Sequence, residues 1–111
     1  MEDKVALYEL LVASHPDAVL KGDTIPYTSL NGHMYTMLSK DGVVAIRLPD
    51  PSRTEFLKKY NTQLDVQYGI VRKEYVVVPD ALLKKTKELK KYFELSHQYV
   101  ASLKPKPGKK K

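Results

Sequence analysis

The sequence contains no cysteine among its 111 residues. This absence excludes a disulfide framework, a thiolate zinc site and a cysteine nucleophile together, and it is typical of a reducing compartment. Long apolar runs are also missing, since the opening segment MEDKVALYELL is acidic before a short apolar stretch. We therefore expect neither a signal peptide nor a membrane span, and predict a cytoplasmic protein that does not associate with membranes.

Motifs that carry catalysis are missing too. The six serines occur in no Gly-x-Ser-x-Gly context, and the scattered glycines form no phosphate-binding loop. His15, His33 and His97 lie far apart without metal-ligand spacing, and are expected to be surface or interface residues. We predict a protein that is not an enzyme and that needs no cofactor or metal.

The sequence does have an excess of positive charge, with a formal net charge of +6. Its last eight residues hold five lysines, and without them the chain has 14 basic and 13 acidic residues. The tail 104–111 also contains two prolines, one glycine and no apolar residue, so we expect it to be disordered. Residues 1–103 are then predicted to form one domain.

Two turn signals dominate the region from residue 25 to residue 48. Asn31-Gly32 and Asp41-Gly42 each lie between runs of aromatic, aliphatic and β-branched residues. Both pairs tolerate the positive φ angles that a two-residue hairpin turn requires. The sequence therefore predicts a three-stranded antiparallel meander over residues 25–30, 33–39 and 43–48.

Two-residue turns would fix the register of this meander. Thr28 would lie opposite Tyr35, and Met37 opposite Ile46, which gives one apolar face suited to helices. The second face is more apolar than a water-exposed sheet face should be. A terminal segment could cover it, a three-residue loop could shift the register, or it could bind a partner. Its members would be Ile25, Tyr27, Ser29, Met34, Thr36, Leu38, Val43, Ala45 and Arg47.

The candidate partner-binding residues lie on or beside this second face. Tyr27, Met34, Leu38 and Val43 supply its large apolar groups, and His33 follows the first turn next to neighbouring tyrosines. The leading hypothesis is that this face binds a protein partner or a second copy of the chain, giving a homodimer. The alternative of a small-molecule binder would use a pocket around His33 and Tyr27.

The remaining elements complete an α+β fold of two layers around an antiparallel sheet. Apolar spacing predicts a first helix over 3–14, with Leu7 and Leu10 widening its buried stripe. Asp50 as N-cap, with a Ser52–Glu55 capping box, predicts a short second helix. We further predict strands at 63–68 and 74–78, a link at 69–73 between them, and a long helix over 81–103.

The long helix presents lysines on the side opposite its apolar residues. Such a pattern is usual for the solvated back of an amphipathic helix. Alternatively, Lys84, Lys87 and Lys91 could join Lys104 and Lys106 in a strip that contacts nucleic-acid phosphates. No recognised nucleic-acid-binding module accompanies the charge.

Several pieces of the sequence, in order, resemble the TfoX N-terminal domain family, also called TfoX/Sxy. They are Asn31-Gly32 followed by His33-Met34-Tyr35, then Arg47-Leu48-Pro49, and then Lys73-Glu74-Tyr75-Val76 before Pro79. The resemblance extends from about Lys21 to Pro107. A Met-Phe-Gly-Gly segment that many members have before the first turn is replaced here by residues 25–29, IPYTS.

The resemblance implies a two-layer α+β domain with the order helix, three strands, helix, two strands, helix. It also implies a link to the regulation of natural competence, which the better-known two-domain members share. We expect this chain to correspond to a stand-alone first domain with a regulatory or interaction role, and do not carry the competence function over. The family supplies no catalytic residues to transfer.

Overall fold

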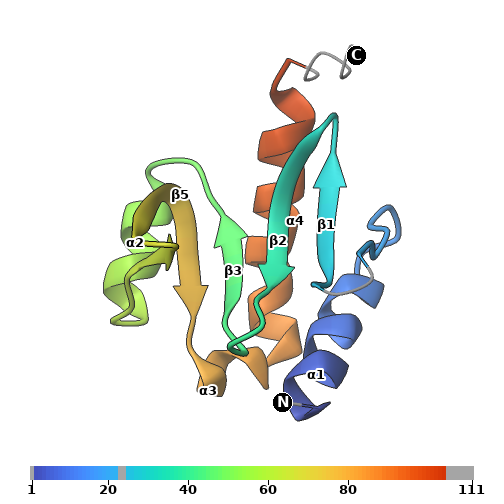
Figure 1. The fold of residues 1–111 in the computed structure, drawn as a ribbon. Coiled ribbons are helices and arrows are strands. Elements are labelled where there is room, and N and C mark those ends of the chain that lie inside the picture. The colour runs from blue at the N-terminus through green and yellow to red at the C-terminus, as the bar shows by residue number, and fades with distance from the viewer. Residues whose placement is uncertain (1, 23–24, 105–111) are drawn as a thin grey trace.

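A computed structural model describes residues 2–22 and 25–104 of the chain. These residues form a five-stranded antiparallel sheet with strand order β1-β2-β3-β5-β4, and helices cover one of its faces (Figure 1). The predicted α+β class is confirmed. The elements are α1 (Glu2–Ala13), β1 (Tyr27–Leu30), β2 (His33–Leu38), β3 (Val44–Arg47), α2 (Ser52–Lys59), β4 (Leu64–Gln67), β5 (Ile70–Val78), α3 (Asp80–Leu83) and α4 (Thr86–Ser102).

The first helix joins the sheet through both apolar and polar contacts. Tyr8 and Leu11 are buried as the helical spacing predicts, but Leu10 is exposed, so its assignment to the buried stripe was wrong. The Tyr8 hydroxyl lies 2.7 Å from Thr36 Oγ1, which lies 2.6 Å from Thr28 Oγ1. Burial raises the pKa of Tyr8, so its hydroxyl stays protonated and can donate within this chain. Buried hydroxyls are therefore satisfied inside the core.

One hydrophobic core fills the space between the sheet and the helices. Tyr35, Phe56 and Phe93 are its fully buried aromatic residues apart from Tyr8. The Tyr35 and Phe93 rings meet edge to face with centroids 5.5 Å apart, an arrangement that adds to the stabilisation from burial. Among the described residues, no buried side-chain nitrogen or oxygen lacks a hydrogen-bond partner. The buried polar side chains of this part of the core are therefore hydrogen-bonded.

The pairing of β1 with β2 departs from the predicted register at Tyr35. Ser29 pairs with Met34 as expected, but Thr28 pairs with Thr36, so that β2 contains one extra residue. Such a β-bulge changes the alternation of side chains along the strand. Thr36 consequently points toward α1, and Met37 points toward the helix-free face. The prediction that Thr28 lies opposite Tyr35 was wrong.

The loop between β2 and β3 shifts the register a second time. Thr36, not Met37, pairs with Ile46, because the loop contains the three residues Lys40–Gly42. The Ser39 amide donates to the Val43 carbonyl at 2.8 Å, and Gly42 has a φ of 82°, as a three-residue hairpin loop requires. The two one-residue shifts cancel, so β3 keeps the face that the sequence predicted.

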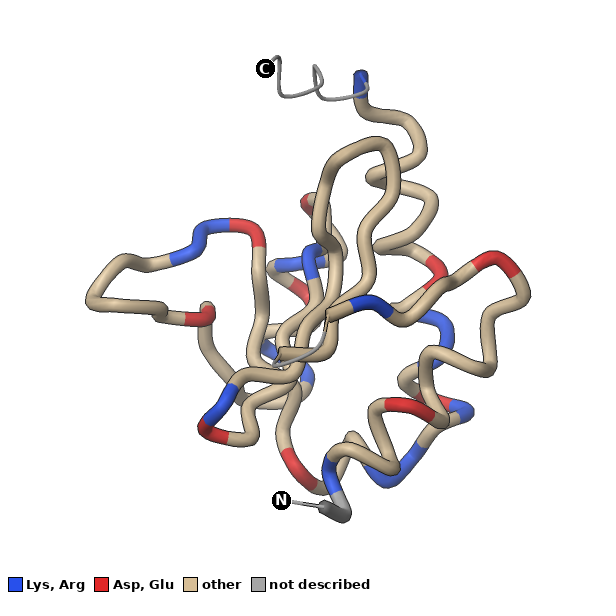
Figure 2. Tube along the Cα trace, turned by 45° about the vertical axis from the view of Figure 1, so that its right-hand side comes forward, with Lys and Arg blue, Asp and Glu red and all other residues tan. Residues whose placement is uncertain are grey.

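The last two strands form a hairpin with an unexpected turn. Tyr68 and Gly69 both have positive φ, at 53° and 76°, and β5 begins directly afterwards. The predicted link at 69–73 was therefore wrong. Leu64 pairs with Val76, whereas Asp65 pairs with Arg72, so the residues between them on β5 are skipped. This irregularity turns the hairpin out of the plane of the sheet, and Figure 2 shows it extending away to the left.

Two helix predictions also needed correction. The capping box of α2 does not form, since Pro51 occupies the N-cap position without a side-chain cap, and Asp50 accepts from Thr54 Oγ1 at 2.8 Å. The long helix predicted over 81–103 is two helices, α3 and α4, separated at Lys84 and Lys85. The change of direction there allows the adjacent residues Leu82 and Leu83 both to be buried.

The C-terminal end of α4 is held by the turn between β1 and β2. Asn31 Nδ2 lies 3.4 Å from the carbonyl oxygens of both Val100 and Ala101, and His33 Nε2 lies 2.9 Å from that of Lys104. Helix C-termini leave such carbonyl groups without intrahelical partners.

In the described part of the chain, no helix has the length and apolar character needed to cross a membrane.

Candidate functional site

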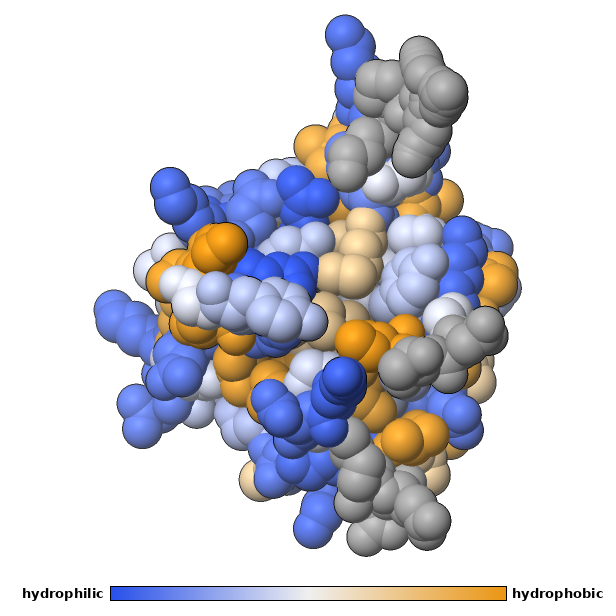
Figure 3. Space-filling model, viewed as in Figure 1, coloured by the Kyte–Doolittle hydropathy of each residue, from blue (hydrophilic) through white to orange (hydrophobic). Residues whose placement is uncertain are grey.

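The helix-free face of the sheet holds an apolar floor. Met34 of β2 lies there as the sequence predicts, the bulge at Tyr35 places Met37 on the same face, and Tyr27 of β1 pairs with Met37. Figure 3 views this face, with hydrophobic side chains running through its centre between hydrophilic groups. Methionine is unbranched and flexible, and it adapts readily to different contact surfaces. The floor therefore has side chains that can adapt to different contacts.

The β4–β5 hairpin forms one wall above this floor. Arg72 holds the hairpin in place, since its guanidinium lies 3.3 Å from Met37 Sδ, 3.7 Å from the Asp65 carboxylate and 4.0 Å from the centre of the Tyr75 ring. Gln67 Nε2 also donates to Asp65 at 3.1 Å. These contacts fix the base of a hairpin whose tip projects into solvent.

Floor and wall enclose a groove of about 400 Å³. This volume is within the range of sites that bind small molecules or protruding side chains. Its lining is mainly apolar and aromatic, with Arg72 and Gln67 as its polar groups. The residues that line it are Ile25, Tyr27, Met34, Met37, Gln67, Tyr68, Ile70 and Arg72.

The tip of the hairpin exposes large apolar side chains. Tyr68 is 95% exposed, Ile70 68%, and Val66 and Val71 51% each. They are four of the eight large hydrophobic residues that are exposed within the described residues. Val66 pairs with Val71, and Gln67 pairs with Ile70, so the exposed apolar side chains lie on both faces of the hairpin. Single exposed apolar residues are common on soluble proteins, whereas several on one short segment make it a candidate for interaction. The sequence reading missed this feature because it treated 69–73 as an irregular link.

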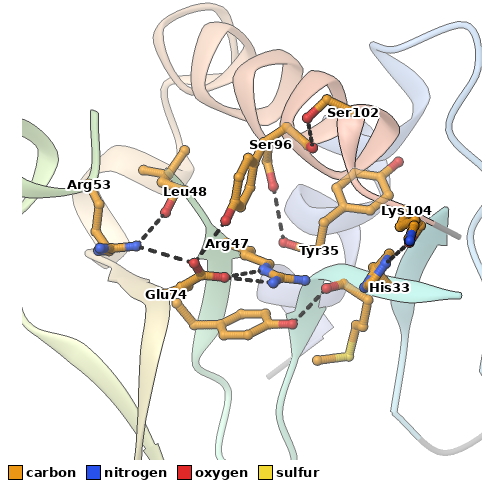
Figure 4. Close-up of polar contacts among 12 residues, drawn as sticks. His33, Tyr35, Arg47, Leu48, Arg53, Glu74, Ser96, Ser102 and Lys104 are labelled. Carbon is orange, nitrogen blue, oxygen red and sulfur yellow. Dashed lines mark hydrogen bonds and ion pairs between the residues drawn. The ribbon is translucent and has the colours of Figure 1, made fainter. Parts of the chain in front are cut away.

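A network of ion pairs and hydrogen bonds lies at the end of β3. Arg47 binds the Glu74 carboxylate at 2.6 and 2.7 Å, and the Tyr99 hydroxyl donates to the same carboxylate at 2.8 Å (Figure 4). Burial raises the pKa of Glu74, but the Tyr99 hydrogen bond and the charges of Arg47 and Arg53 outweigh it and lower the pKa overall. Glu74 is therefore an ionised structural anchor and is poorly suited to act as a general base.

The structure places the five predicted partner-binding residues in different parts of the molecule. Tyr27 and Met34 lie on the helix-free face and line the groove. Leu38 is 1% exposed and belongs to the core beneath the helices, so placing it on the second face was wrong. Val43 lies just before β3, and His33 bonds to the end of α4. The bulge moved Leu38, because it reversed the alternation in the second half of β2.

In the part of the chain that the structure describes, the two residues of the predicted small-molecule pocket, His33 and Tyr27, line different hollows. Tyr27 lines the apolar groove, whereas His33 lines a separate open hollow of about 500 Å³ beside Arg47 and Tyr75. The Tyr75 hydroxyl donates to the Met34 carbonyl at 2.6 Å, between the two hollows.

Two of the three histidines meet although the sequence gave no sign of it. The His15 and His97 rings lie 4.3 Å apart between centroids, and His15 Nδ1 accepts a hydrogen bond from the Asp17 amide at 3.1 Å. Burial lowers the pKa of His97, and the neighbouring His15 lowers it further. Within residues 2–22 and 25–104, no group of three or more histidine or carboxylate side chains could hold a metal ion.

The predicted nucleic-acid-binding lysines lie apart from the groove. Lys84, Lys87 and Lys91 are exposed at α3 and α4, and Lys104 is exposed beyond the end of α4. Lys106 lies outside the described residues, as does most of the tail that the sequence predicted to be disordered. Figure 2 shows basic residues along the helices on the side away from the projecting hairpin.

The structure adds two lysines of α2 to this basic group. Lys58 and Lys59 are exposed in the last turn of α2. Lys59 Nζ lies 5.3 Å from the centre of the Tyr60 ring, and Lys91 Nζ lies 5.6 Å from that of Tyr92. The two tyrosine rings are 5.8 Å apart. Basic and aromatic groups from two helices are thus brought together at a junction that sequence order did not reveal.

Comparison with known proteins provides no relative from which to assign a function. No protein-family model matches the chain, and neither a curated protein nor a solved structure matches it.

Proposed function

We propose that this protein is a non-enzymatic regulatory domain that acts through protein–protein contact at the helix-free face of its sheet. The observation that carries the proposal is the apolar groove beside an exposed apolar hairpin tip. Soluble proteins keep such surfaces where they serve recognition. A cytoplasmic location and self-association as a homodimer belong to the same proposal.

The resemblance to the TfoX N-terminal domain supports a regulatory role. The element order matches the order that the resemblance implies, except that two helices, α3 and α4, follow β5 where the resemblance implies one. The motif residues Asn31 and His33 bond to the end of α4, and Arg47 and Glu74 pair at the end of β3. These contacts give the motif residues Asn31, His33, Arg47 and Glu74 a role in the fold. Recognition in this proposal is therefore assigned to Tyr27, Met34 and the hairpin.

Sedimentation of the wild type and of Met34→Lys tests this proposal. We expect the wild type to associate with itself or with a protein partner, and the lysine to abolish that association by placing a charge on the floor of the groove. Leu10→Lys is the matched control, because Leu10 is an exposed leucine of α1. A wild type that is monomeric and binds no protein through this face would contradict the proposal.

A second candidate function is an accessory role in nucleic-acid binding. The observation that favours it is the junction of Lys58 and Lys59 with Lys91 beside the rings of Tyr60 and Tyr92. Phosphate contacts by lysine and stacking on aromatic rings are the two components of single-strand binding.

Salt titrations of oligonucleotide binding test this second function. Each lost phosphate contact should lower the slope of log affinity against log salt by about 0.9 for duplex and about 0.7 for single strands. Lys58→Gln/Lys59→Gln should therefore lower the duplex slope by about two, and deletion of Pro105–Lys111 should lower it further. Absence of binding at low salt would exclude the function.

A further inference from the structure

We infer that the partner of the helix-free face is a peptide segment of another protein, one that carries a carboxylate beside a large apolar side chain. This inference rests on the proposed function and specifies the chemistry of its partner. The apolar side chain enters the groove, and the carboxylate binds Arg72 at the edge of the groove. The contacts of Arg72, the charge around the groove and the lining of the groove support this assignment.

Arg72 has hydrogen-bonding capacity that the described residues do not use. Its one hydrogen bond to them goes to Met37 Sδ at 3.3 Å, and sulfur is a weak acceptor. The Asp65 carboxylate lies 3.7 Å away, which is too far for a hydrogen bond. The planar guanidinium can bind a carboxylate through two parallel hydrogen bonds. Since the Arg72 side chain is 21% exposed, a carboxylate from a partner can reach it.

Arg47, by contrast, is already engaged within the chain. It binds the Glu74 carboxylate at 2.6 and 2.7 Å, and its guanidinium lies 5.4 Å from the centre of the Tyr99 ring. A carboxylate from a partner would have to displace Glu74 there. Arg72 also lines both the apolar groove and the neighbouring hollow of about 500 Å³. Of the two arginines, Arg72 is therefore the one placed to combine an ionic contact with an apolar one.

Three lysines on or beside this face surround the groove with positive charge. Lys21 pairs with Tyr27 through a β-bridge, and its Nζ lies 3.2 Å from Ser29 Oγ. Lys40 lines a hollow of about 270 Å³, and Lys73 lines the hollow of about 500 Å³. Each of these hollows shares lining residues with the groove.

Acidic residues offset only part of this positive charge. Among the described residues that line the groove and the two hollows, the acids are Asp41 and Glu74. Glu74 is paired with Arg47, and Asp65 is buried beside Arg72. The exposed Asp41 is thus set against three lysines. Such a surface attracts an acidic partner and disfavours a basic one.

The lining of the groove favours a peptide over a nucleic acid or a bilayer. Six of its eight lining residues are aromatic or apolar, and the three lysines lie outside it. Nucleic-acid binding depends instead on lysine and arginine contacts to phosphates. The groove is concave, at about 400 Å³, and suits apolar side chains that protrude from a partner.

Selection from random linear peptides displayed on phage tests this chemistry directly. The immobilised full chain is the bait, and Met34→Lys is the counter-bait, because a charge on the floor of the groove blocks the apolar contact. We expect peptides enriched on the wild type alone to combine aspartate or glutamate with a neighbouring aromatic or large aliphatic residue. Enriched peptides without such an acidic residue would overturn the inference.

A double-mutant cycle with one enriched peptide tests the contact with Arg72. Replacing the acidic residue of the peptide by its amide should raise the Kd for the wild type roughly ten- to a hundredfold, because a charged hydrogen-bonded pair is lost. The same replacement should have little effect on Arg72→Gln. Fluorescence anisotropy measures each Kd, and Lys90→Glu, at an exposed position of α4, should behave as the wild type. Equal losses on wild type and Arg72→Gln would contradict the contact.

Lys40→Glu/Lys73→Glu tests the charge around the groove and decides the matter if Arg72→Gln fails to fold. Both lysines are exposed, so their substitution should leave the fold intact. We expect the Kd for the peptide to rise several-fold at low salt, with a smaller rise at high salt, because exposed charges are screened. An unchanged Kd at low salt would contradict the inference.

The possible outcomes separate this inference from the proposed function. Peptides that need Met34 but carry no acidic residue overturn the acidic partner and keep the interaction module, as does a chain that only dimerises through Met34. Suppose that no peptide is enriched, while Met34→Lys abolishes binding to phosphatidylserine vesicles or to an oligonucleotide. That result overturns both and assigns the face to a membrane or a nucleic acid. A chain that binds nothing through Met34 also overturns both.

Discussion

The two faces of the sheet use the same strands for different purposes. On the helix-covered face, Thr36 and Ile46 are fully buried beneath the helices. On the other face, Met34 and Tyr27 line an open groove. Because side chains alternate along a strand, one sheet can stabilise the fold on one side and present a binding surface on the other. In the proposed function, stability and recognition are thereby assigned to different residues.

The chemistry of the two faces differs accordingly. The covered face is packed with rigid aromatic rings such as Tyr35 and Phe93, whose geometry is fixed by edge-to-face contact. The open face has methionines on its floor, whose unbranched side chains can adapt to different contacts, and exposed tyrosine, isoleucine and valine side chains at the hairpin tip. Substitutions should therefore change the free energy of unfolding on the first face and association on the second.

The largest effect on stability should come from Phe93→Ala. Phe93 is fully buried at the centre of the core, and removing a buried phenylalanine ring costs about 3–5 kcal/mol. Urea denaturation gives the change in the free energy of unfolding. Leu95→Ala, two residues along the same helix and partly exposed, is the control. A cost below about 1 kcal/mol for Phe93→Ala would contradict the division between the faces.

Glu74→Gln should have an intermediate effect of about 1–2 kcal/mol at neutral pH. The change removes a charge that anchors Arg47, but a third of the Glu74 side chain is exposed, so the cost stays below that of a broken buried ion pair. Since folding lowers the pKa of Glu74, its contribution is present above the unfolded pKa of about 4.3 and is lost in acid. The difference in the free energy of unfolding between variant and wild type should therefore narrow as the pH falls. Glu55→Gln, at an exposed position, is the control.

A smaller effect should appear in the dependence of stability on pH between 5 and 7.5. Burial and His15 lower the pKa of His97, and the nearby charges of Asp17 and Glu94 only partly offset this. The unfolded chain thus binds protons more readily, and stability should fall as the pH drops below about 6.5, by less than about 1.4 kcal/mol per pH unit for one proton. Thermal melts of His97→Gln should show a flatter profile, and an unchanged profile would contradict this assignment.

The smallest effect on stability is expected for Tyr68→Ser. Tyr68 is almost wholly exposed, and surface substitutions of this kind change the free energy of unfolding by no more than about 0.5 kcal/mol. Urea denaturation of the variant at a concentration too low for association measures this directly. A cost as large as that of Phe93→Ala would mean that the hairpin tip serves the fold, and the two faces would no longer be distinct in role.

Local signals in the sequence were sufficient to predict the turns and helices whose conformation depends on neighbouring residues. The Asn31-Gly32 turn forms as predicted because its residues tolerate the required positive φ angles. The apolar spacing of α1 and α4 predicted their buried sides, except at Leu10. These features depend on neighbours within a few positions, which a sequence displays openly.

Features that depend on distant contacts could not be predicted in the same way. The bulge at Tyr35 places its ring against Phe93 while Thr36 bonds to Tyr8, so the register depends on two helices far away in the chain. The turn at Tyr68-Gly69 uses a tyrosine with positive φ, which is uncommon. Half of the candidate site, the hairpin wall and tip, was therefore missed, and Tyr27 and Met34 were the parts correctly placed.

The bulge at Tyr35 and the three-residue loop Lys40–Gly42 together constrain how the length of this chain can change. Each adds one residue to the meander, and only their combination returns Ile46 to the core. Deleting a single residue from either place would turn an entire strand over and bury its outer side chains. The two features therefore have to be gained or lost together, so related chains should differ here by two residues or by none.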